Sequence, residues 1–428
     1  RLARTASNAI AAVNRLATTS QTIGSPAQDA RAKAFAFLVL GQALGNLALA
    51  YDSAAIVTPA TPSDVVPGLS GAALVGVTAL LMLDSAVLIA NSPAATNGAN
   101  GFPLPTTWIS GAALTRDNFV RLTRSYKARI RAGLARTPAA RAAVDWAAVI
   151  ADATNGITAD FTVTLGGTTG WSAAYDFNQM YVTGGWHAVP YFYYGMADVS
   201  GSYDAWLATP IGTRRAFAVI TPDKRWPVGA TRAAQQAAGP TVALPPGVYM
   251  RNRPSGEDVP LVGPGDSQYD HRRYGAQWLN SVAGAYTEMS KTEMDMLAAE
   301  GYIRTGNLPA ATALVNVTRV KNGLDAIGSV ASATAAYSTN LTTCVPRVPV
   351  APSFTSTACG SLLEAMKYEK RMETAYTGYF IWFSDNRGWG DLVEGTPVEW
   401  PVPYQEMQSR QKAYYNGTNR APRGTYGF

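Results

Sequence analysis

Apolar residues recur at the three- and four-residue spacing of helices through much of the first 155 residues. The pattern predicts helices over Ser7–Thr19, Pro26–Asp52 and Leu69–Ala90, and two more within residues 115–155. Polar stretches that contain Pro and Gly, such as TPATPSDVVPG, separate these helices as connecting loops do. We therefore expect residues 1–160 to form an N-terminal region of helical hairpins.

The two most apolar runs, Phe35–Ala50 and Leu69–Ala90, have to be compared with membrane-spanning helices. The second run is long enough to cross a bilayer. However, Asp84 lies well inside this run, and the polar stretch NSPAATNGANG follows it without basic residues. We therefore expect a buried helix in the core of a helical hairpin rather than a membrane span.

The pattern changes in residues 161–275, which we interpret as a loop-rich aromatic insertion and a candidate ligand face. FTVTLGG alternates apolar and polar residues as a strand does, and turns and loops follow it. Helical spacing returns in residues 276–328, where Gly306–Asn307 separates two helices with the small apolar residues of tetratricopeptide repeats. A loop with two cysteines (329–360) and a C-terminal helix with a Pro/Tyr-rich tail (361–428) complete the chain. We predict one intertwined, mainly α-helical domain.

Aromatic residues gather in the first part of the insertion. Residues 171–206 contain 11 aromatic residues in 36 positions, against 10% for the whole chain. Exposed aromatic rings often mark a binding surface, because their faces stack on the apolar faces of sugar rings. The alternative is that the rings pack the loops against the helices, and we expect this of most of them. The candidates for ligand contact are Trp171, Tyr175, Trp186, Tyr191, Tyr193 and Trp206.

Charge adds one further feature. The chain carries 35 Lys and Arg against 29 Asp and Glu, a net charge of +6. Between Arg116 and Arg141, apolar positions such as Phe119 and Leu122 recur at helical spacing, with basic residues on the other face. Such a face could contact nucleic acid or lipid headgroups, or it could be solvated. No nucleic-acid-binding module accompanies it, so we favour a solvated face and expect no nucleic-acid partner.

The two cysteines, Cys344 and Cys359, lie in a segment rich in Pro, Ser, Thr and Ala. Neither a histidine nor a second cysteine pair accompanies them, which argues against zinc. We predict a disulfide that closes a surface loop and stabilises the fold by about 3 kcal/mol. A disulfide favours an oxidising compartment outside the cytoplasm.

Candidates for catalysis are few. His187 and His271 are the only histidines, which leaves little for a histidine-based triad or a metal site with several histidines. Glu369 and Glu373 lie four residues apart on one predicted helix face. An acid–base pair would need a cleft and two different pKa values. We interpret both as scaffold residues paired with basic groups, and we expect no catalytic residue, no metal and no cofactor.

The stretch that follows this helix is interpreted in the same way. Glu373 and Asp385 with Arg387 are expected to form a structural network. Four large rings are expected to fill the core beside it: Tyr376, Phe380, Trp382 and Trp389.

Four segments stand in a recognisable order along the chain: AQDARAKAFAFLVLGQALGNLALAYDSAAIV, TEMDMLAAEGYIRTGNLPAATALVNVTRVKNGL, EKRMETAYTGYFIWFSDNRGWGDL and WPVPYQEM. In this order and spacing they resemble the motifs of the SusD/RagB family of outer-membrane nutrient-binding lipoproteins. The resemblance covers most of the chain. Two positions depart from the family pattern: Thr377 stands where the family usually has Glu, and Phe380 where it usually has a basic residue.

The resemblance implies a scaffold of tetratricopeptide-like helical hairpins with a loop-rich insertion. It also implies a cell-surface protein, without enzymatic activity, that binds an oligosaccharide or a peptide. Such a protein delivers its ligand to a SusC-like, TonB-dependent transporter on the extracellular face of the outer membrane. A lipid anchor is implied by the resemblance only.

Two other functions remain open at this stage. The same fold could self-assemble into an extracellular sheet or filament, with its aromatic and Pro-rich loops as subunit contacts. A glycoside hydrolase would need two carboxylates that flank a cleft, and the sequence shows no convincing pair.

Overall fold

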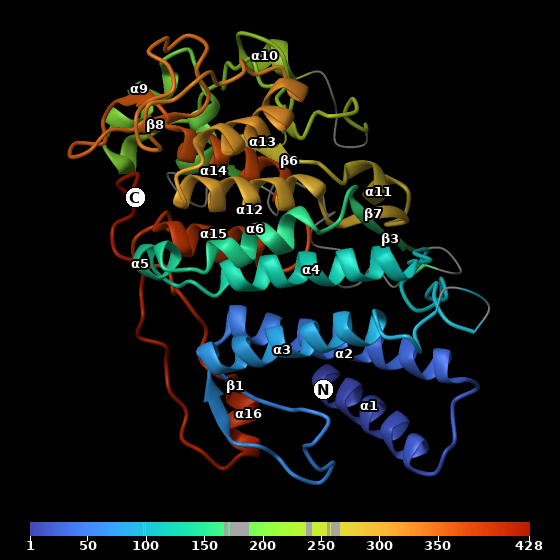
Figure 1. Ribbon diagram of the computed structural model, residues 1–428. Coiled ribbons are helices and arrows are strands. Elements are labelled where there is room, and N and C mark those ends of the chain that lie inside the picture. The colour runs from blue at the N-terminus through green and yellow to red at the C-terminus, as the bar shows by residue number, and fades with distance from the viewer. Residues whose placement is uncertain are drawn as a thin grey trace. The chain divides into compact units, whose positions relative to one another are not determined.

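Figure 1 shows the computed structural model of the chain, which describes all residues except 97, 99, 167–169, 172–187, 237–241, 255–256 and 258–265. Contacts divide the chain into two compact units, each built from segments that are far apart in the sequence. The helical unit comprises residues 1–161, 289–301 and 377–424. The loop-rich unit comprises residues 162–288, 302–376 and 425–428.

Helices make up most of the helical unit. Its elements in chain order are α1 (Leu2–Thr18), α2 (Pro26–Ala50), β1 (Ser53–Ala55), β2 (Leu69–Gly71), α3 (Ala72–Ala90), α4 (Arg116–Gly133), α5 (Pro138–Ala142), α6 (Trp146–Thr154), most of α12 (Lys291–Arg304), α15 (Ile381–Trp389) and α16 (Tyr404–Ser409). Helix α2 packs against α1 and α3, and α4 packs against α3 and α6 (Figure 1). The helical hairpins predicted for the N-terminal region are therefore present.

Small residues let α2 approach its neighbours closely. A Cβ atom added at Gly41 would lie 2.7 Å from the Leu83 side chain of α3. A Cβ atom at Gly45 would overlap the Ile130 side chain of α4. Larger residues at these two positions would push the helices apart, so the glycines of this apolar run are explained by packing.

Helix α3 is only partly buried, which differs from the predicted buried helix. One face, which includes Val75, Ala79 and Leu83, is buried. The other face exposes four aliphatic side chains: Leu74, Val77, Leu81 and Leu88. The helix is apolar all round, and such a pattern cannot show which face a neighbour covers. Both α2 and α3 are long and apolar enough to cross a membrane, by length and composition alone.

The basic residues of α4 are largely engaged in ion pairs, which corrects the expectation of a solvated basic face. Arg124, Lys127 and Arg131 place nitrogen atoms 3.3, 3.2 and 3.5 Å from the carboxylate of Asp152 in α6. The carboxylate of this aspartate is almost fully buried. Asp152 therefore neutralises part of the positive charge of α4, for which the sequence pattern showed no partner.

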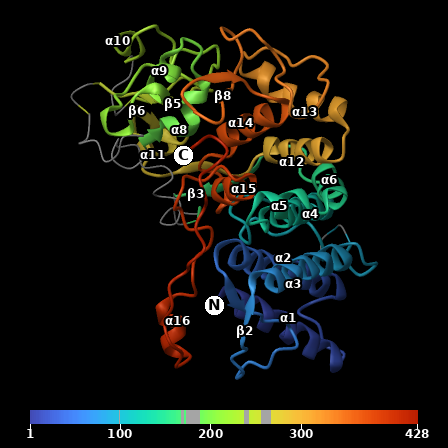
Figure 2. The ribbon, with the colours of Figure 1, turned by 90° about the vertical axis from the view of Figure 1, so that its left-hand side faces the viewer.

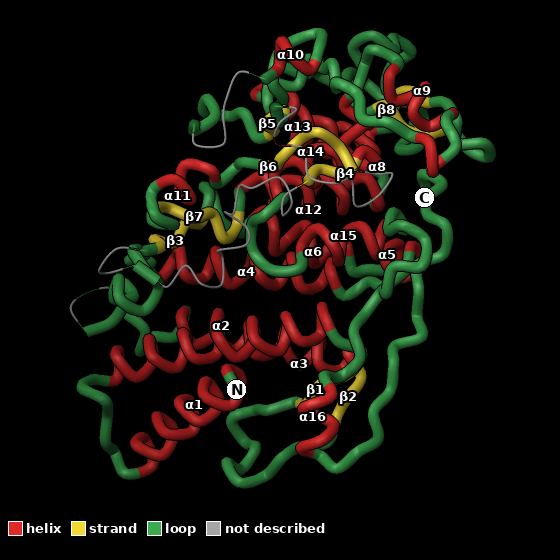
Figure 3. Tube along the Cα trace, turned by 180° about the vertical axis from the view of Figure 1, so that it is seen from behind, coloured by secondary structure: helices red, strands yellow, loops and turns green. Residues whose placement is uncertain are grey.

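The loop-rich unit contains short strands and helices joined by long connections, as the sequence pattern predicted. Figure 3 shows the strands in yellow between green loops. The main elements in chain order are β3 (Phe161–Leu165), β4 (Ala188–Pro190), α8 (Tyr191–Tyr194), α9 (Ser202–Ala208), α10 (Arg232–Gln235), β5 (Met250–Asn252), β6 (Asp266–His271), α11 (Gly275–Leu279), β7 (Gly284–Met289), α13 (Leu308–Lys321), β8 (Arg347–Pro349), β9 (Thr357–Cys359) and α14 (Leu362–Thr374). Strand β3 pairs with β7, β6 lies between β4 and β5, and β8 pairs with β9.

The predicted turn between the two tetratricopeptide-like helices lies between α12 and α13. Gly306 has a φ of +84°, in the left-handed region that favours glycine. The side chain of Asn307 accepts a hydrogen bond from Ala310 N at 3.3 Å and caps α13. Two local signals therefore fix this helix–turn–helix, which explains why the sequence located it correctly.

The two cysteines are joined by a disulfide, as the sequence predicted. Cys344 and Cys359 are both buried, and their sulfur atoms are bonded. Cys359 ends strand β9, and the hairpin of β8 and β9 lies between the two cysteines. The bond therefore fixes a segment that otherwise consists largely of loop.

We expect thiol labelling of the unfolded, unreduced protein to find no free thiol, because both cysteines are in the disulfide. Prior reduction should yield two labelled cysteines, which is the positive control. Two labelled cysteines without reduction would contradict the bond in the isolated protein.

Candidate functional site

Three of the aromatic candidates are buried in the loop-rich unit. Tyr191, Tyr193 and Trp206 are 1%, 6% and 4% exposed. Tyr191 stacks on Phe217, with 4.2 Å between ring centroids, and Trp206 stacks on Tyr203 at 5.9 Å. These rings form an aromatic core beneath the loops, which is the alternative that the sequence left open for most of the aromatic residues.

Hydrogen bonds hold this core in one arrangement. The Tyr191 hydroxyl donates to the carbonyl oxygen of Phe217 at 2.5 Å and accepts from Phe217 N at 2.8 Å. Burial raises the pKa of Tyr191 far above its ordinary value. The phenol therefore stays neutral, and it serves to fix a loop rather than to exchange protons.

Trp171 is the one sequence-predicted candidate that the structure places on the surface. Its side chain is 45% exposed. It follows β3, where Trp171 N donates to Thr164 O at 3.0 Å and Gly166 N donates to Trp171 O at 3.0 Å. Backbone hydrogen bonds thus hold the residue while its ring remains accessible. The other two candidates, Tyr175 and Trp186, lie outside the described residues.

A buried charge cluster centred on Arg225 lies in the same unit. Asp223 binds this guanidinium at 2.7 Å, and Glu369 and Glu373 of α14 each lie 3.0 Å from it. The side chains of Asp223, Arg225 and Glu369 are fully buried. Tyr368 also donates to Asp223, at 2.7 Å. Arg225 lies in the segment PDKRWPVG, whose Pro and Gly residues predict only a turn, so the sequence pattern does not reveal the cation at the centre.

The two glutamates of α14 differ in their surroundings. Glu373 accepts hydrogen bonds from Arg225 at 3.0 Å and from Tyr249 at 2.9 Å. Burial opposes its charge, but Arg225 and Arg273 bring the pKa of Glu373 below its ordinary value. Glu369 accepts no well-aligned hydrogen bond among the described residues. Burial therefore raises the pKa of Glu369 in spite of the arginine beside it.

This arrangement supports the structural interpretation of the two glutamates. The different pKa directions would suit an acid and a base, but the carboxylates are buried and point at arginines. A general acid or base has to come within hydrogen-bond distance of its substrate. The cluster is therefore suited to holding α14 in the unit.

A second buried cluster lies in the helical unit, and it corrects the predicted network of Asp385 with Arg387. Asp385 instead binds Arg141 of α5 at 3.1 Å, and Glu300 of α12 binds the same guanidinium at 2.6 Å. Arg387 donates to the carbonyl oxygens of Leu49 at 3.0 Å, Gly133 at 2.9 Å and Val398 at 2.7 Å. Spacing on one short helix suggested the pair, whereas residues far away in the sequence provide the partners.

The four rings after α14 are less buried than the sequence predicted. Trp389 is buried and donates to Glu300 at 3.0 Å. Tyr376, Phe380 and Trp382 are only half-buried. The left-handed backbone at Tyr376 and Phe380 ends the continuous helical pattern and begins α15 separately, so the rings do not share one face.

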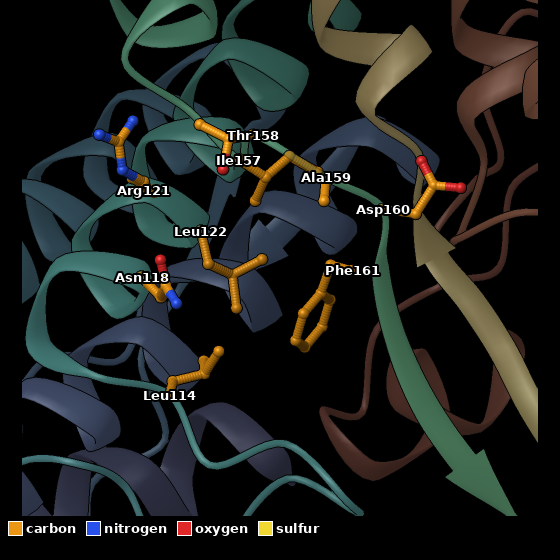
Figure 4. A pocket seen from close by; sticks show the side chains of 9 residues that line it. All are labelled: Leu114, Asn118, Arg121, Leu122, Ile157, Thr158, Ala159, Asp160 and Phe161. Atoms are coloured by element: carbon orange, nitrogen blue, oxygen red, sulfur yellow. The ribbon is translucent and has the colours of Figure 1, made fainter.

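The helical unit contains a pocket between the start of α4 and the segment that enters β3 (Figure 4). Its volume is about 150 Å³, and Leu114, Leu122 and Phe161 supply much of the apolar lining. The Asp160 carboxylate at its edge accepts a hydrogen bond from Lys291 N at 2.8 Å. Small-molecule sites typically measure about 300–1,000 Å³, so this pocket is too small for an oligosaccharide.

The described residues contain no group of three or more His, Cys, Asp or Glu side chains placed to hold a metal ion. Of the two histidines, His271 is buried on β6, and His187 lies outside the described residues.

Comparison with known proteins gives the fold. No protein-family model and no curated protein matches the chain. Among solved structures, surface glycan-binding protein A from Bacteroides uniformis is 12% identical and has a TM-score of 0.50, over 96% of this chain and 83% of its own. A SusD superfamily protein from Bacteroides thetaiotaomicron is 12% identical with a TM-score of 0.49, over 95% and 80%. A laminarin-binding SusD-like protein is 13% identical with a TM-score of 0.48, over 96% and 84%.

The likeness to the Bacteroides uniformis protein shows that this chain has the same fold. The predicted fold class is confirmed: the structure is mainly α-helical, with helical hairpins and a loop-rich part. The helical scaffold with a loop-rich part that the SusD/RagB resemblance implied is therefore present.

Proposed function

We propose that the chain is a cell-surface glycan-binding protein without enzymatic activity. It captures an oligosaccharide and delivers it to a SusC-like, TonB-dependent transporter in the outer membrane. The fold class supports this function, although the same fold can host unrelated functions. The residues on the surface of the molecule therefore have to distinguish between these functions.

The proposal depends on one observation: the aromatic side chains that remain exposed lie outside the long helices. Among the described residues, the exposed aromatic side chains are Trp171, Trp400, Tyr404, Tyr414 and Tyr415. All five lie outside the long helices, on polar segments. Sugar rings present C–H groups on one face and hydroxyls at their edges, and the negative face of an aromatic ring attracts such C–H groups. Exposed rings on polar segments match this chemistry.

Trp171 provides the first test, because it is the exposed candidate of the loop-rich unit. Each stacked ring is expected to contribute about 1–3 kcal/mol, on the scale measured for bases stacked on aromatic side chains. The Trp171→Ala variant should therefore bind a glycan at least about fivefold more weakly, with an unchanged melting temperature. Isothermal titration with soluble starch, laminarin and pectin measures the binding.

Val228→Ala is the matched control, because this side chain is almost fully exposed in the same unit. Its affinity should equal that of the wild type. A product assay accompanies the titration, and release of shorter sugars would overturn the proposal that the protein is not an enzyme. If none of the three glycans binds the wild type, glycan binding itself is contradicted.

Self-assembly is a second candidate function, and the exposed face of α3 favours it. Leu74, Val77, Leu81 and Leu88 are all more than half exposed. Aliphatic side chains that gather on one surface often mark a contact between proteins. Sedimentation at rising protein concentration would reveal larger species if this face joins copies of the chain.

The proposed location is the extracellular face of the outer membrane. A lipid anchor and the SusC-like partner are carried by the resemblance to the SusD/RagB family. Co-purification with a TonB-dependent transporter from the native membrane would support the delivery step.

A further inference from the structure

The C-terminal tail of the helical unit carries four of the five exposed aromatic side chains. Trp400, Tyr404, Tyr414 and Tyr415 are 42%, 62%, 62% and 40% exposed. All four lie in or beside α16, which Figure 2 shows at the end of an extended stretch of chain. We call these four residues the tail platform. Trp400 and Tyr404 lie in WPVPYQEM, one of the four segments that resemble the SusD/RagB motifs, and the resemblance gives them no role in binding.

The tail is fixed to the rest of the helical unit by backbone hydrogen bonds. Trp400 N donates to Ala50 O at 2.9 Å, and Asp52 N donates to Trp400 O at 2.9 Å. Arg410 donates to Pro67 O at 2.7 Å. These bonds join the tail to the end of α2 and to the loop before β2. The segment is therefore held by backbone bonds at Trp400 and by the side chain of Arg410.

Two of the four platform side chains, those of Tyr415 and Trp400, are also held individually. The Tyr415 hydroxyl donates to the carboxylate of Asp52 and accepts a hydrogen bond from Val402 N at 3.1 Å. Trp400 packs against Phe380, with 4.7 Å between ring centroids. A surface whose groups are already ordered loses less conformational freedom when it binds a ligand.

Tyr404 and Tyr414 are the most exposed rings of the platform. Their centroids are 6.3 Å apart, and their planes make an angle of 87°. The two rings thus meet edge to face, and both side chains are 62% exposed. Stacking on such faces needs a ligand with several C–H surfaces, which successive sugar rings of one chain provide.

A pocket of about 330 Å³ adjoins the platform, and Pro403, Glu406 and Arg410 of the tail line one side of it. Tyr51 and Leu47 line the side formed by the end of α2. The volume falls within the range of about 300–1,000 Å³ that is typical of small-molecule sites. The pocket is lined by neighbours of the platform in the chain, and the four platform side chains do not line it.

The polar residues of the tail suit sugar hydroxyl groups. Gln405 and Gln408 are exposed between Tyr404 and Tyr414 in the chain, Asn416 is exposed directly after Tyr415, and the side chain of Glu406 is half-exposed. Amide and carboxylate groups supply both the donors and the acceptors that hydroxyls require.

The same composition argues against a protein partner. In residues 399–419, all of which the structure describes, the exposed large hydrophobic residues are aromatic. The exposed face of α3, by contrast, carries only aliphatic ones. A protein contact buries a continuous apolar centre, whereas the platform alternates rings with amides. Its chemistry therefore fits a carbohydrate better.

We propose that the tail platform is a carbohydrate-binding site of the helical unit, separate in sequence from Trp171, and that it binds an oligosaccharide chain by stacking on Tyr404 and Tyr414. The proposal rests on the proposed function for its ligand class. It goes beyond that function because it assigns binding to a segment for which the resemblance implies no ligand contact.

The test uses Tyr404→Ala and Tyr414→Ala, singly and together, in the full chain. Trp400 and Tyr415 are left unchanged because they fix the tail. Binding to soluble starch, laminarin and pectin is measured by titration calorimetry and by mobility in native gels that contain the polysaccharide. The double variant should bind the recognised glycan at least about tenfold more weakly, as expected for the loss of two stacked rings.

Three controls separate stacking from other effects. Tyr404→Phe with Tyr414→Phe keeps both rings, so it should retain most of the affinity. Leu88→Ala removes an exposed aliphatic side chain of the same unit and should leave binding unchanged. The melting temperature of each variant should match that of the wild type, because the two tyrosine side chains are exposed.

The outcomes are distinguishable from those of the Trp171 test. Glycan binding that is lost with Trp171→Ala but unchanged in the double tyrosine variant overturns the tail platform and leaves the proposed function intact. Weaker binding in the double variant supports the platform whatever Trp171→Ala does. If the wild type binds none of the glycans, both proposals fail. A change in self-association instead of glycan binding would identify the tail as a protein contact and would also overturn the proposal.

Discussion

The Arg225→Met variant is expected to lose about 3–5 kcal/mol of the free energy of unfolding at neutral pH. The guanidinium lies within 3.0 Å of three carboxylates, those of Asp223, Glu369 and Glu373. Methionine fills part of the space but supplies no charge. It would leave these carboxylates buried beside one another without their central cation. Urea denaturation followed by far-UV circular dichroism measures the loss.

The pH dependence of this loss distinguishes a charge effect from a packing defect. Burial already raises the pKa of Glu369, and the loss of Arg225 removes the cation that most opposes this rise. The folded variant then binds protons more readily than its unfolded state, so its stability rises as the pH falls from 7 towards 5. The difference from the wild type should therefore shrink over this range. A loss that is the same at both pH values would point to packing alone.

The stability of the wild type should change in the opposite direction at lower pH: it should fall as the pH falls. The pKa of Glu373 lies below its ordinary value, so this group stabilises the folded state above the pKa of the unfolded chain. That contribution disappears as the pH falls below about 4.5 and through the lowered pKa of the folded state.

Arg215→Met serves as the control for the charge change in Arg225→Met, since Arg215 is exposed in the same unit. Its effect should stay within about 0.5 kcal/mol.

The fold was readable from the sequence where local signals agree. Helical spacing located the N-terminal hairpins, and Gly306 with Asn307 located the turn before α13. The spacing of the two cysteines matched no metal-binding motif, and the structure shows that they form the predicted disulfide. In each case residues close in the sequence determine the structure, and no knowledge of distant contacts is required.

The charged and aromatic residues were harder to place because their environment depends on distant segments. The partner of Asp385 is Arg141, which lies 244 positions away. Aromatic residues are equally suited to a core and to a binding surface. Tyr191 and Trp206 are buried by packing within the loop-rich unit, whereas Tyr404 and Tyr414 remain exposed in a short tail. Residue type alone could not separate these two outcomes.

The Arg141→Met variant is expected to lower the free energy of unfolding of the helical unit by about 3–5 kcal/mol. Arg141 is fully buried and forms two hydrogen bonds with Glu300, at 3.0 and 2.6 Å. It also binds Asp385, and it donates to Ala132 O at 2.7 Å. Removal of this guanidinium would take the cation away from two buried carboxylates, those of Glu300 and Asp385, while Trp389 still donates to Glu300.

Arg141→Lys tests whether geometry matters as well as charge. Lysine keeps the positive charge but cannot form the paired hydrogen bonds that the planar guanidinium forms with Glu300. Its loss of stability should therefore lie between zero and that of Arg141→Met. Arg15→Met is the matched control, because Arg15 is exposed on α1 of the same unit, and its effect should stay within about 0.5 kcal/mol. Equal losses for Lys and Met would show that the positive charge alone contributes little and that the paired hydrogen bonds dominate. A loss below about 1 kcal/mol for Met would contradict a stabilising role of the whole cluster, because an unpaired buried carboxylate costs more than that.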